Sequence, residues 1–80
     1  MKRIHVEGHT DSVGDAKFNL DLSQRRAQSV VNFLVSQGVS RQLLRPKGYG
    51  ESRPKVKERT KADQNINRRV EFKVEFKPAK

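Results

Sequence analysis

The amino-acid sequence predicts an α+β fold, a two-layer α/β sandwich in which one main helix packs on one face of a small mixed sheet. Two observations predict it. Residues near both ends of the chain alternate between apolar and polar, which is typical of strands, and a long segment between them has apolar residues at helical spacing. The predicted order is strand, helix, strand, strand. The helical crossover favours a parallel pairing of the first two strands, and the last strand adds to the same sheet.

The first strand and the loop after it are predicted from alternation and glycine content. Ile4 and Val6 alternate with polar neighbours, so a short strand with one apolar face is expected to end at Gly8. Residues 8–15 combine two glycines with small polar side chains, a composition that is typical of loops. This loop is therefore expected to connect the end of the strand to the start of a helix.

The main helix is predicted over about residues 16–37. Gly38 follows and is a typical helix stop. Four apolar residues fall on one side of this helix when successive residues are placed about 100° apart: Leu20, Ala27, Val31 and Leu34.

Two adjacent arginines lie on different sides of this predicted helix. Arg25 lies opposite the apolar stripe and is expected to be solvated, whereas Arg26 lies at the margin of the stripe. Helical side chains lean toward the helix N-terminus. The stem of Arg26 is therefore expected to follow apolar surface and to present its guanidinium at the first-turn end of the helix.

A second strand and a long loop are predicted after the helix. Residues 43–49 are expected to form a strand entered through one turn of helix, and Pro46 favours an edge or a strand end because proline lacks a ladder N–H. Residues 50–64 are basic and contain few apolar side chains, so they are predicted to form a long exposed loop. Loops of that length are often functional.

The last strand has the clearest alternation in the chain. The pattern runs over residues 66–76 and places the apolar residues from Val70 to Phe76 on the core face. Residues 78–80 are expected to be a frayed tail. The predicted domain therefore covers residues 1–77. One helix covers little of a three-stranded sheet, so a bare apolar strip is expected.

Composition limits the class of protein. The chain has 80 residues, a net charge of +9 and no cysteine, so it is one small domain without disulfides, thiolate zinc sites or a thiol nucleophile. This excludes a large multidomain enzyme. The apolar runs are too short to span a membrane, and the first residues do not form the apolar block of an export signal, so neither is expected in this chain.

Patterns that could bind a metal or a cofactor, or carry catalysis, are incomplete. His5 and His9 flank Glu7, but a zinc-protease motif needs Glu directly after the first His, on a helix. The segment from Gly48 to Gly50 lacks the third glycine and the helix of a dinucleotide loop. The carboxylates are scattered among basic residues, and no supported catalytic triad is present. We therefore expect no metal, no cofactor and no enzymatic activity.

The positive charge indicates an anionic partner as one alternative. A basic cluster in the predicted loop, together with a sequence pI near 10.5, is a footprint of nucleic-acid binders. However, the chain has no aromatic-rich platform and no basic recognition helix, so specific nucleic-acid binding is not expected and a solvated basic surface is the simpler interpretation. The basic cluster consists of Lys55, Lys57, Arg59 and Lys61.

Asp11 and Arg26 form the sharpest candidate site. Asp11 lies in the loop before the helix, and the guanidinium of Arg26 points back toward the same end of the helix, so both can face one pocket. A carboxylate beside a guanidinium complements a zwitterion, because the first binds an ammonium and the second binds a carboxylate. The alternative is that Asp11 and Arg26 simply pair with each other as a structural salt bridge.

Several short motifs follow one another in a fixed order over about residues 3–76. They are Gly8-His9-Thr10-Asp11, Gly14, Asn19, Leu22-Ser23, Arg25-Arg26-Ala27, Gly48-Tyr49-Gly50-Glu51, Pro54 and Asn67-Arg68-Arg69-Val70-Glu71. In this order the motifs resemble the OmpA-like peptidoglycan-binding domain.

The resemblance implies a non-catalytic domain that binds the stem peptide of peptidoglycan through its meso-diaminopimelate residue. By position, Asp11 would hold the ammonium group of this residue and Arg26 its carboxylate. The resemblance also assigns Leu22 to the wall of the pocket, and Thr10 and Asn19 to the loop around it.

The Asn-Arg-Arg-Val motif is a weaker part of the predicted site. Asn67, Arg68 and Arg69 resemble supports of the pocket, but strand parity places the two arginines on opposite faces. Arg68 has core-face parity at the entrance of the strand. It is either the arginine turned toward the pocket, or a bulge shifts the register.

The chain also departs from the family pattern. Members begin with another strand and helix, which contribute an aromatic-acidic pair at the pocket rim and cover the sheet, whereas this chain resembles the second half of the domain, a β-α-β-β half-domain. A homodimer or an exchange of elements between chains is therefore expected to supply the cover, and a ligand-free assembly element is a further alternative.

The resemblance also implies a place in the cell. The expected location is the periplasm, associated with the outer membrane, where the domain anchors that membrane or an envelope complex to the wall. Contact with the membrane itself would come only through a region of the parent protein outside this chain.

Overall fold

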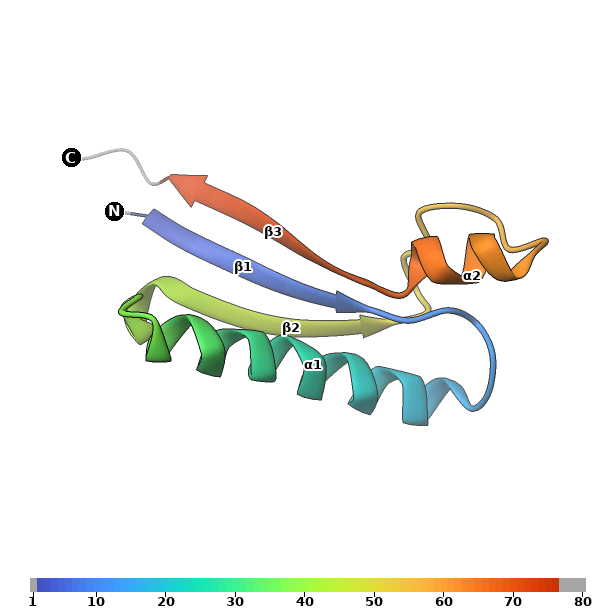
Figure 1. The fold of residues 1–80 in the computed structure, drawn as a ribbon, viewed down its shortest axis with the longest axis horizontal. Helices are drawn as coiled ribbons and strands as arrows, with labels where there is room; N and C mark the ends of the chain where they lie inside the picture. The colour runs from blue at the N-terminus through green and yellow to red at the C-terminus, as the bar shows by residue number, and fades with distance from the viewer. Residues whose placement is uncertain (1, 77–80) are drawn as a thin grey trace.

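The computed structural model describes residues 2–76, and the predicted tail at residues 78–80 lies outside them. The described residues form three strands, two α-helices and one turn of 3-10 helix (Figure 1). In chain order these elements are β1 (Lys2–His9), α1 (Ala16–Ser36), η1 (Arg41–Leu43), β2 (Leu44–Gly50), α2 (Lys61–Asn67) and β3 (Arg69–Phe76). The predicted α+β class is confirmed, since α1 packs along one face of a mixed sheet.

The sheet has the order β2-β1-β3. β1 pairs with β2 in parallel and with β3 antiparallel, as the crossover through α1 predicts. Pro46 lies on β2, an outer strand of the sheet, which confirms the edge position that its lack of a backbone N–H predicted. Val6 on the central strand is opposite Pro46 on one side and Phe72 on the other.

The ends of α1 follow local capping rules. Asp15 is the N-cap, and its side chain accepts a hydrogen bond from the Lys17 N–H. At the other end, Gly38 adopts φ +100° and donates to the carbonyl of Val35, while Val39 donates to the carbonyl of Leu34. This is the Schellman arrangement, in which glycine accepts the left-handed conformation. The predicted stop at Gly38 is confirmed.

The core is small and lies between α1 and the two strands β1 and β2. Its fully buried apolar side chains are Val6, Ala27, Val31 and Leu44. The prediction for Leu20 was wrong, because this side chain is 51% exposed. Asn19 and Ser23 face the sheet in its place. At that end of α1 the helix backbone lies close to Gly8 of β1, so a large side chain does not fit between them. Ser23 fits because it is small and its hydroxyl donates to the Leu20 carbonyl within the helix.

The predicted long loop ends earlier than expected, because residues 61–67 form α2. Thr60 and Asp63 make a capping box: the Thr60 hydroxyl accepts from the Asp63 N–H, and the Asp63 carboxylate accepts from the Thr60 N–H. The strand predicted from residue 66 therefore starts only at Arg69. Ile66 has the right parity for the strand but is part of this helix and is largely exposed.

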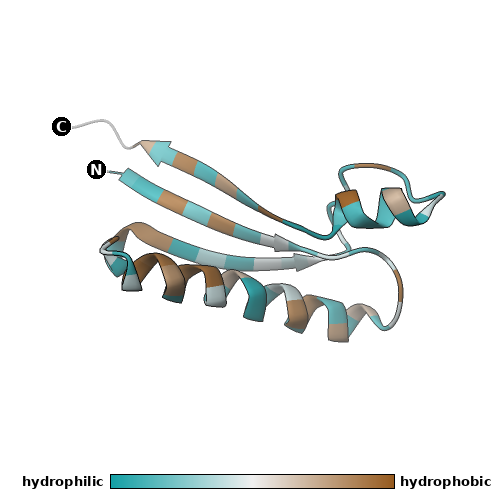
Figure 2. Ribbon diagram, viewed as in Figure 1, coloured by the Kyte–Doolittle hydropathy of each residue, from teal (hydrophilic) through white to brown (hydrophobic). Residues whose placement is uncertain are grey.

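The predicted core face of β3 is mostly uncovered. Phe72 is opposite Val6, so it faces the same side of the sheet as the core, yet Phe72 is 54% and Phe76 is 73% exposed. α1 lies over β2 and β1 and leaves β3 free (Figure 1). Figure 2 shows the apolar residues of β3 alternating with polar ones along this free strand. The expected bare apolar strip is present, and of these β3 residues only Val70 packs against the core.

Candidate functional site

Asp11 lies at the corner where the loop after β1 meets the junction of α2 and β3. Its side chain is buried, and one carboxylate oxygen, Oδ2, lies 3.0 Å from Nη1 of Arg68. The other oxygen, Oδ1, accepts a hydrogen bond from the Val13 N–H. The carboxylate is therefore fixed in position by the loop backbone and by one guanidinium.

An open pocket of about 440 Å³ lies at the same corner. It is lined by Arg26 of α1, by Asn65 and Arg68 of the α2 end, and by Arg69 and Val70 of β3. Three of these five residues are arginines, so the pocket is strongly cationic and suits a carboxylate. The exposed Arg26 reaches it from α1, as expected from the lean of helical side chains.

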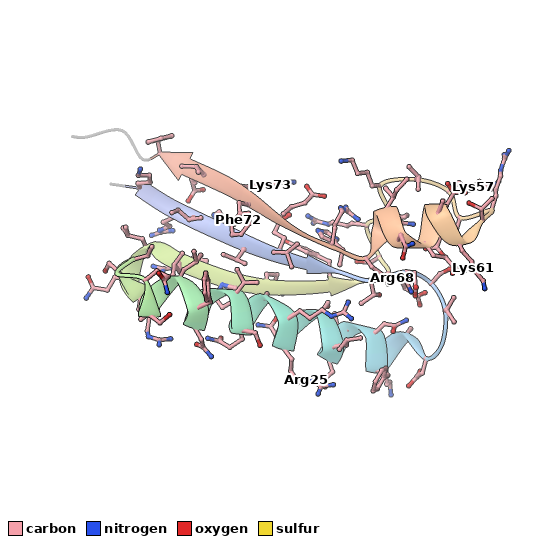
Figure 3. All side chains as sticks on the ribbon, in the orientation of Figure 1. Arg25, Lys57, Lys61, Arg68, Phe72 and Lys73 are labelled. Carbon is pink, nitrogen blue, oxygen red and sulfur yellow. The ribbon has the colours of Figure 1, made fainter. Side chains whose placement is uncertain are left out.

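The structure does not pair Asp11 with Arg26. Among residues 2–76 the ion-pair partner of Asp11 is Arg68, and Arg26 has no acidic group within ion-pair distance. Asp11 and Arg26 are therefore linked through Arg68, which contacts the first and lines the pocket with the second. Arg25, by contrast, extends from the far side of α1 (Figure 3) and pairs with Asp21 at 2.8 Å. Both side chains are exposed, as predicted for Arg25.

Arg68 and Arg69 differ in their partners. Arg68 is the C-cap of α2, so its direction follows from the helix end and the parity expected for a strand does not apply to it. Arg69 is the first residue of β3, pairs with Glu71, and donates to the carbonyls of Asn67 and Arg53. Arg68 is therefore the arginine turned toward Asp11, and Arg69 joins β3 to the neighbouring loop.

Asn67 holds the preceding loop against this corner. It is fully buried, and its Oδ1 accepts from the N–H groups of Lys55 and Val56, while its Nδ2 donates to the Val56 carbonyl and to Glu58. Glu58 in turn accepts from the hydroxyl and the N–H of Ser12. This chain of contacts ties three separate segments together beside the Asp11 loop.

Sequence reasoning missed Glu58 and Ser12. The hydrogen bonds from Ser12 and Asn67 hold the pKa of the Glu58 carboxyl below its usual value. The sequence signal for Glu58 was weak. An acidic residue within a basic stretch is equally compatible with a solvent-exposed charge and with a buried hydrogen-bond acceptor.

The three remaining predicted residues have different surroundings. Thr10 is buried and donates through its hydroxyl to the carbonyl of Asp11. Asn19 is buried on α1 and donates to the carbonyl of Val13 at 3.0 Å, so it ties the helix to the loop. Leu22 is half-buried on α1 and is not one of the residues that line the 440 Å³ pocket.

None of the four residues of the basic cluster lines this pocket. Lys57 and Lys61 are at the far end of the molecule, on the loop and on α2, and extend into solvent (Figure 3). Lys57 also lines a second, smaller hollow of about 240 Å³ with Glu51 and Glu58. The acidic neighbours reduce the local positive charge there.

His5 and His9 do not form a metal site with Glu7. Within residues 2–76 no group of three or more possible ligands is placed to hold a metal ion. His9 is buried on the face of the sheet opposite α1 and stacks on Tyr49 with ring centroids 5.5 Å apart. In the same described part of the chain, neither helix combines the length and apolar character needed to cross a membrane.

Acidification is expected to destabilise the fold through His9. Burial, together with the positive charge of Arg69, lowers the pKa of His9 below 6.5. Near pH 6.5 His9 therefore binds a proton in the unfolded chain but stays neutral in the folded chain. The free energy of unfolding falls as the pH drops below that value. Thermal denaturation at pH 7.5 and 5.5 should show this loss. His9→Gln should remove that part of the pH dependence, whereas His5→Gln should keep it.

Comparison with known proteins decides the family. The model of the OmpA family matches residues 1–68. The chain belongs to the OmpA family. It is 49% identical over 72 residues to outer membrane porin F of Pseudomonas fluorescens, covering 90% of this chain and 22% of the porin. It is 43% identical over 70 residues to the peptidoglycan-associated lipoprotein of Legionella pneumophila, covering 88% of this chain and 40% of the lipoprotein.

Solved structures agree with this assignment. The crystal structure of the peptidoglycan-associated lipoprotein from Burkholderia pseudomallei superimposes with a TM-score of 0.89 at 28% identity, over 92% of this chain and 63% of that one. The C-terminal domain of Helicobacter pylori MotB also gives 0.89 at 28% identity, over 95% of this chain and 59% of that domain. The OmpA-family chain thus spans less than half the length of these two curated relatives and about three fifths of the solved domains.

Proposed function

We propose that this OmpA-family chain is a non-catalytic module that binds peptidoglycan and anchors the outer membrane, or a complex of the cell envelope, to the wall. Its relatives include proteins named as peptidoglycan-associated lipoproteins and outer membrane porins, which supports this role and a periplasmic location at the outer membrane. No cofactor or metal takes part in the proposed binding.

The proposed ligand is the meso-diaminopimelate residue of the stem peptide. The observation that carries this proposal is the cationic pocket of Arg26 and Arg68 beside the buried carboxylate of Asp11. In the proposed complex Arg26 binds the carboxylate at the end of the ligand side chain. Asp11 accepts from its ammonium, because a carboxylate offers about four acceptor positions and the described contacts, from Val13 and Arg68, leave some of them free.

Arg68 has a positioning role in this proposal. It neutralises Asp11 in part and holds the carboxylate beside an arginine that lines the pocket, while Asn67 and Glu58 keep the end of α2 in place. Each charged hydrogen bond at such a site contributes about 1.5–3 kcal/mol. Two or three such hydrogen bonds, less the free-energy cost of association, give the isolated domain a weak to moderate affinity. Many domains bound to one wall increase the overall affinity.

Retention on insoluble peptidoglycan is expected to depend on the pocket. Arg26→Ala and Asp11→Asn should each weaken retention by about 10- to 100-fold, the equivalent of one charged hydrogen bond. Arg25→Ala is the matched control, since this neighbouring arginine points away from the sheet and should bind like the parent. Circular dichroism checks that each variant is folded. Equal retention of all four proteins would remove the proposed site.

A change of ligand tests the assignment of Arg26 itself. A stem peptide with lysine in place of diaminopimelate keeps the ammonium but lacks the terminal carboxylate. Amide NMR titrations of the parent should therefore show tighter binding of the diaminopimelate peptide. Arg26→Ala should bind both peptides equally, because it has lost the group that distinguishes them. A preference that persists in Arg26→Ala would assign the carboxylate to another residue.

Nucleic-acid binding through the basic cluster is the competing function, favoured only by the net charge of +9. Binding of oligonucleotides at two salt concentrations separates the two. Tight binding that falls steeply with salt and is unchanged in Asp11→Asn would support the competing function.

A further inference from the structure

Two of the five residues that line the cationic pocket have little left to offer a ligand. Val70 has no polar side-chain atom. The Nε of Arg69 donates to Glu71, and its two Nη atoms donate to backbone carbonyls, those of Asn67 and Arg53. Each nitrogen of the Arg69 guanidinium therefore already has an acceptor. The ligand contacts are left to the other three lining residues.

The guanidinium of Arg68 is held from two sides. Its Nη1 lies 3.0 Å from Oδ2 of Asp11, and its Nη2 donates to Oδ1 of Asn65. Asn65 and Arg68 are three residues apart at the C-terminal end of α2, a spacing at which two side chains meet on one face of a helix. The pair therefore holds the Asn65 side chain in place beside the pocket that both residues line.

This contact decides which end of the Asn65 amide is available to a ligand. A guanidinium has N–H donors and no acceptor, so the atom of Asn65 that meets Arg68 is the carbonyl oxygen, Oδ1. The amide nitrogen, Nδ2, makes no hydrogen bond within residues 2–76. Asn65 therefore brings two uncommitted N–H groups to the pocket.

Arg26 is the second uncommitted donor group. Its exposed side chain reaches the pocket from α1, whereas Asn65 reaches it from α2, and in the described part of the chain Arg26 forms no ion pair. Both groups offer N–H donors, which suit the two oxygens of a carboxylate. A carboxamide has the same shape, but one oxygen is replaced by an NH₂ group. That group would face donors and stay unpaired.

We propose that Asn65 is a ligand-binding residue that, together with Arg26, selects a free carboxylate over a carboxamide at the side-chain end of the ligand. The inference rests on the proposed binding of diaminopimelate and narrows the ligand to stem peptides in which this carboxylate is not amidated. Nδ2 of Asn65 donates to one carboxylate oxygen and Arg26 to the other. A site that hydrogen-bonds one group discriminates against an analogue that leaves polar groups unpaired.

Replacing the Asn65 amide with a carboxylate tests this selection. Amide NMR titrations of the 80-residue chain compare two stem peptides, one with the free side-chain carboxylate of diaminopimelate and one with that carboxylate amidated. The parent should bind the free acid at least tenfold more tightly, the equivalent of one hydrogen bond to a charged group. Asn65→Asp keeps an oxygen for Arg68 but presents an acceptor to the ligand, so this ratio should fall at least tenfold. Asn65→Ala loses only the donor and should lower the ratio less.

Asn32→Asp is the matched control, because it makes the same change of charge at an exposed position of α1 outside the pocket. It should keep the ratio of the parent, and the amide spectrum shows that each variant is folded. If Arg26→Ala weakens binding of the free acid while both Asn65 variants keep the ratio of the parent, the inference is overturned and the proposed function stands. A parent that binds both peptides equally overturns the inference as well. A parent that binds neither peptide overturns the proposed function and the inference together.

Discussion

Gly8→Ala is expected to destabilise the fold strongly. An added Cβ at Gly8 would lie 2.2 Å from the backbone carbonyl oxygen of Ser23, so α1 cannot remain at its distance from β1. Overpacking of this kind costs about 3 kcal/mol or more when backbone rather than a side chain must move. A domain of 80 residues has a total stability of about 4–12 kcal/mol. Thermal denaturation followed by circular dichroism should show a large fall in Tm or no folded baseline.

Gly14→Ala is the matched control for this prediction. Gly14 has no atom within 4 Å of an added Cβ, but its φ of +93° disfavours alanine. The expected loss is therefore about 1 kcal/mol, from backbone strain alone. Gly48→Ala should resemble Gly8→Ala, because its Cβ would meet the backbone of Gln24 at 2.4 Å. Equal stability of the Gly8 and Gly14 variants would contradict the close packing of α1 on the sheet.

Asn67→Ala is expected to reduce both stability and ligand binding. The substitution leaves the Lys55 and Val56 N–H groups without their acceptor and removes the donor to Glu58, so we expect a loss of about 2–3 kcal/mol. Arg68 follows Asn67 directly, and the loosened end of α2 should no longer hold its guanidinium beside Asp11. Binding of the diaminopimelate peptide should therefore weaken although Asn67 does not touch the pocket.

Urea denaturation and amide NMR together test this prediction. Asn32→Ala is the control, since Asn32 is exposed on α1 and accepts only from Gln28. It should lose less than about 0.5 kcal/mol, as surface substitutions do. A folded Asn67→Ala variant that binds the peptide like the parent would show that Arg68 is held in place without the Asn67 contacts.

Local patterns predicted most of the elements. Alternation identified β1 and the greater part of β3, and the helical spacing with Gly38 gave the bounds of α1 to within a residue. α2 was missed because its seven residues are too few to show a helical period, and its capping box lies inside a basic stretch that suggested a loop. The prediction for Leu20 was wrong because the spacing of apolar residues along the helix carries no information about the glycines on the strands. Those glycines let the backbone of α1 approach the sheet closely, which leaves no room for a large side chain there.

The role of the candidate site stays a prediction. The lean of helical side chains predicted that Asp11 and Arg26 face one pocket. The structure lines a pocket with Arg26, whereas Asp11 is not among its lining residues. Two alternatives were predicted for Asp11 and Arg26: joint binding of a ligand, or a salt bridge between them. Neither included Arg68 as the partner of Asp11. That contact depends on where α2 ends, and strand parity carries no information about a helix cap.

The sequence by itself determined the order of strands and main helix, the capping of α1 and membership of the OmpA family, because these depend on residues that are near neighbours or stand in a fixed order. Only the tertiary structure decided that Arg68 pairs with Asp11 and that Asn67 and Glu58 tie three segments together. These features join residues far apart in the chain. Their distances are set by how closely α1 packs on the sheet and by how little of it one helix can cover.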